Sequence, residues 1–342
     1  MNPLIGALAT GLVVGVACIP LQDAAAQTKV NFAIDWKFEG PAAPFTVALD
    51  KGYYADEGLD VSIDSGSGSS QTIPRIATGN YDLGSGDLSA LVKFKDQNPD
   101  AAVQSVMVLY DAPAYSIVSL AGSGIDPSDP KSLEGHKLGA PPPDSAFAQW
   151  PGFVRINDID ESAVTIESIG FPVREPMLAA GEVDGIFGFS FSSFLNLKSK
   201  GVPAGDIRVM LMSDHGLALY GNMVIANTDF AREHPEAVKG FIRATIRGLK
   251  ETIADPQAAI ASITSRNDVA REEVEVERLE MALHDNIVTE RVKENGFGAA
   301  KIDRLETSLD QIGIGYDYVN RPAVADIYTS DYLPDVSTRM LR

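Results

Sequence analysis

Cysteine and histidine are scarce in this chain. Among 342 residues there is one cysteine, Cys18, and there are four histidines. Cys18 lies in a segment that we expect to be removed, so the mature chain would hold no disulfide, no thiolate nucleophile and no cysteine metal site. The histidines stand singly at His136, His215, His234 and His284, and no H-E-x-x-H motif occurs, so the sequence gives no support for a zinc site.

Basic residues are outnumbered by acidic ones. The chain has 28 Lys and Arg against 47 Asp and Glu, which gives a formal net charge of −19. This balance argues against nucleic acid and against anionic membrane surfaces as partners, because both attract basic patches. Beyond residue 26 no run of 18 uncharged apolar residues occurs, so we expect a mature protein that is soluble and not embedded in a membrane.

Motifs for phosphate and dinucleotide cofactors are absent or incomplete. No Gly-Lys-Ser or Gly-Lys-Thr occurs, which excludes a Walker phosphate loop. Residues 66–71 begin like a dinucleotide fingerprint, but Gln71 stands where the third glycine belongs. Residues 188–192 approach the nucleophile elbow G-x-S-x-G but end in Ser192. We therefore expect no cofactor, no metal and no enzymatic activity.

The first 26 residues differ from the rest. Residues 5–21 are apolar and rich in small side chains, and three alanines at 24–26 then form an A-x-A cleavage signature. This pattern predicts a secretory signal peptide over residues 1–26, a mature start near Gln27 and a periplasmic location. The alternative is a retained membrane anchor, although the run is short for a span. Lipid attachment at Cys18 is not expected, because Gly15 stands where a lipoprotein box has a leucine-like residue.

Short β-rich runs alternate with helical stretches from residue 30 onward. This rhythm is typical of an α/β fold with mainly parallel strands, and 342 residues are enough for two domains. A stretch rich in Gly, Ser, Asp and Pro at 121–130 indicates a crossing between domains just before it. We expect one lobe from residues 27–119 plus 222–342 and a second lobe from residues 120–221. Long amphipathic helices in the C-terminal part are expected to cover the first lobe.

Several segments carry a resemblance to a known family. They are Asp35-Trp36, APFTVA at 43–48, KGYYADEGLDV at 51–61, IATGNYDLG at 76–84, LEGHKLG at 133–139, LAAGEVDG at 178–185 and HPEAV at 234–238. In order and spacing, over about residues 30–334, the chain resembles the periplasmic binding proteins of ABC importers for nitrate, sulfonates, taurine and thiamine-type pyrimidine precursors.

The resemblance implies a fold and a function. The expected fold is that of a type II periplasmic binding protein, in which two α/β lobes joined by two chain crossings close on a solute. The expected function is a monomeric receptor that delivers a small polar or heteroaromatic molecule to ABC permease subunits. Asp35-Trp36 resembles the branch that binds thiamine precursors. Taurine, alkylsulfonates and nitrate are alternative ligands, and an enzyme similar to thiamine-pyrimidine synthases is the alternative class.

Candidate binding residues lie in the loops that follow the strands, because ligands of open α/β sheets bind beyond the carboxyl ends of the strands. These loops, with the segment where the chain recrosses, hold Trp36, Phe38, Glu39, Gly66, Ser67, Gly68, Ser69, Ser70, Asp87, Ser89, Asp144, Ser145, Phe189, Ser190, Tyr220 and Asn222.

The loop at residues 66–70 has the clearest physical case. Its glycines let backbone N–H groups approach a ligand, its serines add hydroxyl donors, and the helix that follows directs its positive end at the cleft. We expect this loop to suit a carboxylate, sulfonate or phosphate, and the alternative is a solvated turn that binds nothing. Trp36 would stack on a flat ring, or it is a core residue.

Other candidates have two interpretations each. Asp87 would pair with an amine of the ligand or would cap a helix. Tyr220 and Asn222 would line the hinge side of the cleft or would satisfy backbone groups there. Arg155 and Arg174 would supply charge to an anion or would be surface residues.

Overall fold

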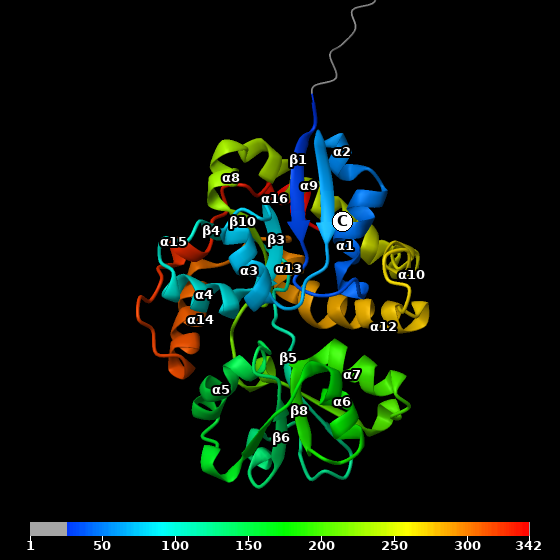
Figure 1. The fold of residues 1–342 in the computed structure, drawn as a ribbon, viewed down its shortest axis with the longest axis vertical. Coiled ribbons are helices and arrows are strands. Elements are labelled where there is room, and N and C mark those ends of the chain that lie inside the picture. Colours follow the sequence, from blue (N-terminus) through cyan, green and yellow to red (C-terminus); the bar gives the residue numbers. More distant parts are fainter. Residues whose placement is uncertain (1–25, 342) are drawn as a thin grey trace, which may run out of the picture.

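Two five-stranded sheets, each flanked by helices, form the two lobes of the protein (Figure 1). The computed structural model describes residues 26–341. The expected signal peptide and Cys18 therefore lie outside the described residues, except for Ala26. Within the described range, no helix is both long enough and apolar enough to cross a bilayer.

The first sheet has the strand order β2-β1-β3-β10-β4. Strand β1 is parallel to β2 and β3, whereas β10 is antiparallel to β3 and β4. All five residues of β3 are buried, so this strand lies at the centre of the lobe. The strands of this sheet are β1 (Thr28–Ala33), β2 (Leu59–Asp64), β3 (Leu83–Asp87), β4 (Val103–Val108) and β10 (Asn222–Asn227).

The second sheet has the strand order β7-β6-β8-β5-β9. Strand β6 is parallel to β7 and β8, and β5 is antiparallel to β8 and β9. Only two residues of the edge strand β9, Ile207 and Met210, are buried. The strands of this sheet are β5 (Tyr115–Leu120), β6 (Lys137–Ala140), β7 (Thr165–Ser168), β8 (Gly185–Phe189) and β9 (Ile207–Leu211).

Helices cover both sheets. Those of the first half of the first lobe are α1 (Ala43–Asp50), α2 (Tyr53–Asp56), α3 (Ser69–Ala77) and α4 (Leu88–Gln97). Those of the second lobe are α5 (Trp150–Ile156), α6 (Phe171–Ala179) and α7 (Ser190–Ser199). After β10 come α8 (Thr228–Glu233), α9 (Pro235–Ala254), α10 (Pro256–Ala259), α11 (Ala261–Thr264), α12 (Glu272–Ala282), α13 (Glu290–Asn295), α14 (Ile302–Gly315), α15 (Val324–Ile327) and α16 (Val336–Arg339).

The chain crosses between the lobes twice, as expected, but the first crossing comes earlier than residue 119. Strand β5 bonds along its whole length to β8 and β9, so the crossing precedes Tyr115. The two crossing segments are bonded to each other: Tyr110 N–H donates to the Asn222 carbonyl and Gly221 N–H donates to the Tyr110 carbonyl, each at 2.9 Å. Gly221 permits this approach, since a Cβ there would lie 2.9 Å from Tyr110 Cβ.

The C-terminal helices cover the first lobe, and two of them also contact the second. Helix α9 is amphipathic and packs on α1, which itself covers the first sheet. Helix α12 packs on α7, and α14 packs on α5 (Figure 1). At the contact between α14 and α5, a Cβ on Gly315 would lie 2.7 Å from the backbone nitrogen of Gly152. The two lobes are therefore held by helices as well as by the crossings.

Candidate functional site

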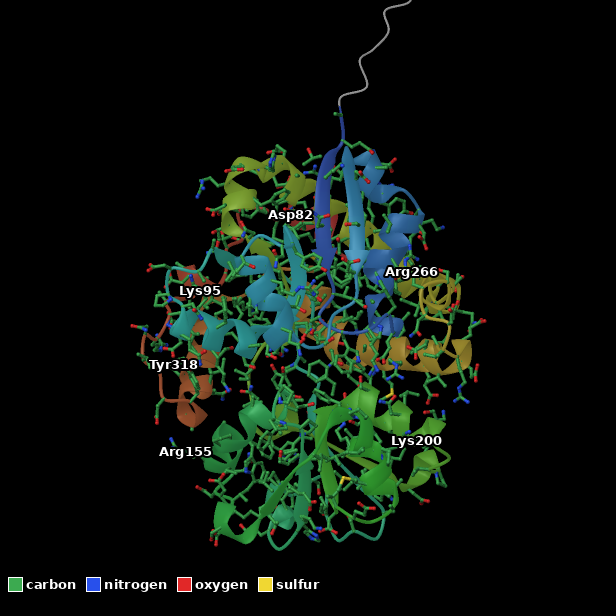
Figure 2. The ribbon with its side chains drawn as sticks, viewed as in Figure 1. Asp82, Lys95, Arg155, Lys200, Arg266 and Tyr318 are labelled. Atoms are coloured by element: carbon green, nitrogen blue, oxygen red, sulfur yellow. The ribbon has the colours of Figure 1, made fainter. Side chains whose placement is uncertain are left out.

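A cavity lies between the two lobes, at the carboxyl ends of several of their strands. It encloses about 1090 Å³ when its open side is included, and Figure 2 shows that side chains occupy the region between the two lobes. The first lobe contributes the segment after β1, the start of α3 and the start of β10, and the second lobe contributes the segments after β6 and β8. A pocket of this size and position is suited to a small molecule.

Asp35 is the polar centre of the first-lobe wall. It follows β1, and its carboxylate accepts hydrogen bonds from Ser69 Oγ at 2.9 Å, Ser85 Oγ at 3.0 Å and Asn222 Nδ2 at 2.9 Å. The Asp35 N–H donates to Ser85 Oγ at 2.9 Å. These donors come from α3, β3 and β10, so three elements that are distant in sequence hold one carboxylate in place.

The start of α3 is where the sequence predicts an anion site, and the structure places a carboxylate of the protein itself there. Ser69, the first residue of α3, donates to Asp35, and the Gly68 N–H donates to the Asp35 carbonyl at 2.7 Å. The positive end of the helix therefore already faces a negative charge. A second negative charge at this helix end would be repelled by Asp35, so the arrangement disfavours the anion site that the sequence suggests.

The rest of that loop lies off the cavity. Ser67 and Ser70 are exposed to solvent and do not line the cavity. Gly66 is required for packing, since a Cβ there would lie 2.4 Å from the Ile34 carbonyl oxygen. Among residues 66–70, only Gly68 and Ser69 line the cavity.

Asn222 lines the cavity and carries a buried acceptor that nothing in the described residues satisfies. Its Nδ2 must face Asp35, because a carboxylate accepts but does not donate. Its Oδ1 then has no hydrogen-bond partner anywhere in the described part of the chain, although the residue is only 5% exposed. A buried polar atom without a partner costs roughly 1–3 kcal/mol, so a donor that reached this atom would recover that free energy.

Aromatic rings form the remaining walls. Trp36 of the first lobe meets Phe171 of the second edge to face, with ring centroids 5.4 Å apart. Tyr110 and Phe189 each meet Phe191 in the same way, at 6.3 Å and 5.9 Å. Burial raises the pKa of Tyr110, and the charges of nearby carboxylates raise it further, so this phenol stays protonated at neutral pH. The walls offer flat faces on which a planar ring can stack.

Glu39 is a second carboxylate on the first-lobe wall. It lines the cavity and lies 3.6 Å from Arg278 Nε. Burial raises the pKa of Glu39, the charge of Arg278 opposes that effect, and the neighbouring Glu275 adds to it. The carboxyl is therefore an acceptor whose charge is only partly compensated.

Arg174 supplies a guanidinium to the second-lobe wall, but its donors are already engaged. Nε and Nη2 donate to Glu175 Oε1 at 2.9 and 2.6 Å, and Nη1 donates to Asp144 Oδ2 at 3.1 Å and to the Phe187 carbonyl at 3.3 Å. Burial raises the pKa of Asp144 and the charge of Arg174 opposes it. Arg174 is thus buried and not a surface residue, yet two carboxylates surround its charge.

Half of the predicted residues line the cavity. They are Trp36, Glu39, Gly68, Ser69, Asp144, Ser145, Phe189 and Asn222. Further residues line the cavity, among them Asp35, Ser85, Tyr110 and Phe171. Asp35 is adjacent to the predicted Trp36, whereas Tyr110 and Phe171 become neighbours of the predicted residues only through the fold.

The other predicted residues lie elsewhere for identifiable reasons. Asp87 and Ser89 are buried at the start of α4, where the Asp87 carboxylate caps the helix and accepts from Tyr115 Oη. Phe38 lines a neighbouring groove, and Ser190 is buried at the start of α7. Tyr220 is buried in the crossing segment, and its hydroxyl accepts from the Lys301 N–H at 2.9 Å. These side chains therefore cap a helix, lie buried beside it, line the neighbouring groove or lie in the crossing segment.

Within residues 26–341 no group of three or more His, Cys, Asp or Glu side chains is placed to hold a metal ion.

The fold is shared with solved binding proteins. The periplasmic aliphatic sulphonate binding protein SsuA of Escherichia coli aligns with a TM-score of 0.69 at 12% identity, over 89% of this chain and 99% of that one. The periplasmic nitrate-binding protein NrtA of Synechocystis PCC 6803 aligns with a TM-score of 0.67 at 12% identity, over 90% and 87%. At such low identity the likeness establishes the fold, which is that of periplasmic binding proteins, as expected.

Relatives in sequence have names of two kinds. The riboflavin-binding protein RibY of Chloroflexus aurantiacus is 28% identical over 222 residues, which is 64% of this chain and 60% of that protein's length. The 4-amino-5-hydroxymethyl-2-methylpyrimidine phosphate synthase of Candida albicans is 28% identical over 247 residues, 68% of this chain and 70% of that protein. The family described as NMT1/THI5 like matches residues 41–259, a stretch that includes most of the cavity wall and both crossings. With the fold, the cavity and this match in agreement, the chain belongs to the NMT1/THI5-like family.

Proposed function

We propose that this protein is the solute receptor of an ABC import system. It captures a small molecule in the interlobe cavity in the periplasm and delivers it, chemically unchanged, to a membrane permease. The cavity between two lobes and the fold shared with SsuA and NrtA support this proposal. Closure of the lobes on the solute would create the shape that the permease recognises.

The proposed ligand is a planar heteroaromatic ring that carries N–H donors, such as an aminopyrimidine. The unpartnered Oδ1 of Asn222 is the observation that carries this choice. Asp35 and Glu39 add carboxylate acceptors to the same cavity, and Trp36 and Phe171 add ring faces. A ring with amino groups satisfies the acceptors and stacks on the aromatic walls at the same time.

The same arrangement disfavours sulfonates and nitrate. At about 4 Å and an effective dielectric constant of about 20, an anion beside Asp35 is repelled by roughly 4 kcal/mol. A helix N-terminus offers an anion only about 0.3–1 kcal/mol, and that of α3 already serves Asp35. Arg174 does not restore the balance, because Asp144 and Glu175 engage it.

A thermal-shift screen of the purified protein tests the proposal. The panel contains 4-amino-5-hydroxymethyl-2-methylpyrimidine, riboflavin, taurine, an alkanesulfonate and nitrate. A ligand at 100 times its Kd stabilises the fold by about 2.7 kcal/mol, so we expect the melting temperature to rise by several degrees with a ring compound. Stabilisation by the sulfonate or nitrate alone would contradict the ligand class, and no response to any compound would contradict the receptor.

Matched variants assign any response to the cavity. Asn222→Leu removes the free acceptor at similar volume, and we expect Kd to rise about tenfold, which corresponds to about 1.4 kcal/mol. Asn98→Leu alters an exposed asparagine after α4 and should leave Kd unchanged. Equal effects of the two substitutions would show that Asn222 has no special part in binding.

A synthase-like enzyme is the second candidate, favoured by the names of several relatives. Mass spectrometry after incubation of the protein with a deproteinised cell extract separates the two. A synthase adds 4-amino-5-hydroxymethyl-2-methylpyrimidine phosphate, the product in those relatives' names, to the extract, whereas a receptor adds no new compound.

A further inference from the structure

Arg278 on α12 connects the two lobes beside the cavity. The residue is 3% exposed, and its Nε lies 3.0 Å from Glu275 Oε2 and 3.6 Å from Glu39 Oε2, both in the first lobe. Its Nη1 donates to the Phe191 carbonyl at 3.4 Å, and its Nη2 donates to Asn196 Oδ1 at 3.3 Å. Phe191 and Asn196 belong to α7 of the second lobe.

Two of the groups around Arg278 belong to the walls of the cavity. Glu39 and Phe191 line it from opposite lobes. The Glu275 carboxylate also accepts from the Gly40 N–H at 2.7 Å, which ties α12 to the segment that carries Glu39. One guanidinium therefore links both walls, and its bonds to α7 exist only while the lobes stay together.

The two sides of the cleft are held in different ways. On the Arg278 side, contacts between α12 and α7 include polar bonds and the exposed ion pair of Lys198 with Glu277. We call the boundary between α12 and α7 the seam. A groove lined by Asn196, Arg278 and the segment containing Phe38 runs along it next to the cavity. On the Arg278 side Phe191 also packs in the apolar cluster of Leu279. On the other side α14 packs on α5 mainly through apolar side chains and a close glycine contact, and Gln311 of α14 adds hydrogen bonds to the Ala218 N–H and the Gly216 carbonyl. Water can replace polar bonds at little cost, whereas separating apolar surfaces exposes them.

We propose that Arg278 is the positioning residue that latches the closed form, and that the cleft opens along the seam between α12 and α7 while α14 and α5 stay packed. In the open form Nη1 and Nη2 lose their acceptors on α7. A solute that contacts Glu39 and Phe191 needs both walls in place, so it favours the latched arrangement. This inference rests on the proposed solute capture, but its first test needs no solute.

Distance measurement between spin labels tests the latch. Lys200 of the second lobe and Asp268 of the first are exposed, and their chain neighbours Ser199 and Asn267 line the groove. Figure 2 labels Lys200 and Arg266, the latter two residues from Asp268, on the same flank of the molecule. Lys200→Cys and Asp268→Cys in a Cys18→Ser chain supply two thiols, and double electron–electron resonance then reports the width of the seam.

The expected result is a difference between matched variants. Without solute, the parent chain should give a mainly short distance, and Arg278→Gln should move much of the population to a longer one. Arg278→Lys, which keeps the charge beside Glu275 but cannot reach both acceptors, should give an intermediate distribution. Lys198→Ala removes an exposed interlobe pair and should leave the distribution unchanged. If Arg278→Gln gives the same distance distribution as the parent chain, the proposed latch is overturned.

A second variant guards against unfolding, since Arg278→Gln leaves Glu275 and Glu39 without their cation. Asn196→Ala removes only an acceptor on α7 and should lengthen the distance while circular dichroism stays native. If Asn196→Ala is natively folded and gives the same distance as the parent chain, the proposed latch is also overturned.

Solute kinetics provide a second readout. With 4-amino-5-hydroxymethyl-2-methylpyrimidine as the probe, stopped-flow fluorescence of Trp36 in Asn196→Ala should show about a tenfold faster dissociation rate and a nearly unchanged association rate. An unchanged dissociation rate with this probe counts against the latch. If no variant and not even the parent binds the probe, the proposed ligand fails, and the solute-free distances still decide the latch.

Discussion

At the scale of single residues, the Asp87 carboxyl shows how burial governs a helix cap. It is fully buried, and it accepts from the Ser89 N–H at 2.9 Å, the Ala90 N–H at 3.3 Å and the hydroxyls of Ser89 and Tyr115. Burial raises its pKa above the ordinary value of 3.8, and the hydrogen bonds oppose this shift. The folded form therefore holds its proton at a higher pH than the unfolded chain does.

This shift predicts a pH-dependent effect of Asp87→Asn. The protonated carboxyl contributes stability that is present below about pH 3.8 and is lost as the pH rises through the folded pKa. Asparagine keeps the cap but does not titrate. We therefore expect the unfolding free energy of the wild type minus that of the variant, measured by urea denaturation, to fall as the pH rises above about 3.8.

Asp126 is the control with the opposite sign. This exposed carboxyl accepts from the backbone and hydroxyl of Ser128, which lowers its pKa. Its contribution is present above the unfolded value and is lost as the pH falls, so for Asp126→Asn the same difference should rise with pH. Parallel slopes for the two variants would contradict the role of burial at Asp87.

The residues of the cavity show what sequence can and cannot predict. The sequence directs attention to the loops after the strands, because strand ends meet at one edge of a sheet, and half of the residues named there line the cavity. Asp87, a polar residue in such a loop, turned inward as a cap, and Asp35 took the helix end expected to bind an anion. Local pattern does not distinguish these roles, since each depends on a partner from another strand.

At the scale of elements, alternation of strands and helices predicted most of the sheets but not their order. Strand β10 enters between β3 and β4 in antiparallel direction and brings Asn222 next to Asp35. No periodicity in the sequence encodes that neighbour, because it follows from the return of the chain after the second lobe. Likewise, the contacts of α12 and α14 with the second lobe depend on tertiary packing rather than on helix amphipathicity.

The contact between α9 and α1 gives a prediction at this scale. A Cβ on Gly248 would lie 2.2 Å from the Pro44 carbonyl oxygen and 2.9 Å from Ala48 Cβ. Alanine gains about 1 kcal/mol in helix propensity over glycine, but overpacking against rigid backbone costs roughly 1–3 kcal/mol. We expect Gly248→Ala to lower the unfolding free energy by about 1 kcal/mol in chemical denaturation.

The matched control for this substitution is Gly205→Ala, where a Cβ would meet nothing within 4 Å. It should change the unfolding free energy by less than about 0.5 kcal/mol. Pro44 and its neighbour Phe45 line the cavity, so Gly248→Ala should also weaken solute binding while Gly205→Ala leaves it intact. A Gly248→Ala protein as stable as the parent would mean that α9 and α1 can separate freely.

At the scale of the whole molecule, Arg304 on α14 joins the two crossings. Its guanidinium donates to the carbonyls of Asp111 and Leu219, one from each crossing, and to Asp111 Oδ1 at 2.9 Å. It also lies over the Tyr220 ring, 3.8 Å from the centroid. The pivot of the lobes is thus fastened to the helix that packs on α5.

Removal of this guanidinium should make the two crossings more mobile without separating α12 from α7. Arg304→Leu removes the donor to three carbonyls, those of Asp111, Ala218 and Leu219, at roughly 1–3 kcal/mol for each group that stays buried. We expect hydrogen exchange measured by mass spectrometry to accelerate at residues 109–113 and 217–222 and to stay unchanged on α12. Arg232→Leu, which removes an exposed ion pair with Asp229, is the control and should alter neither segment. Unchanged exchange at both crossings in Arg304→Leu would show that the backbone bonds between Tyr110 and Asn222 hold the pivot by themselves.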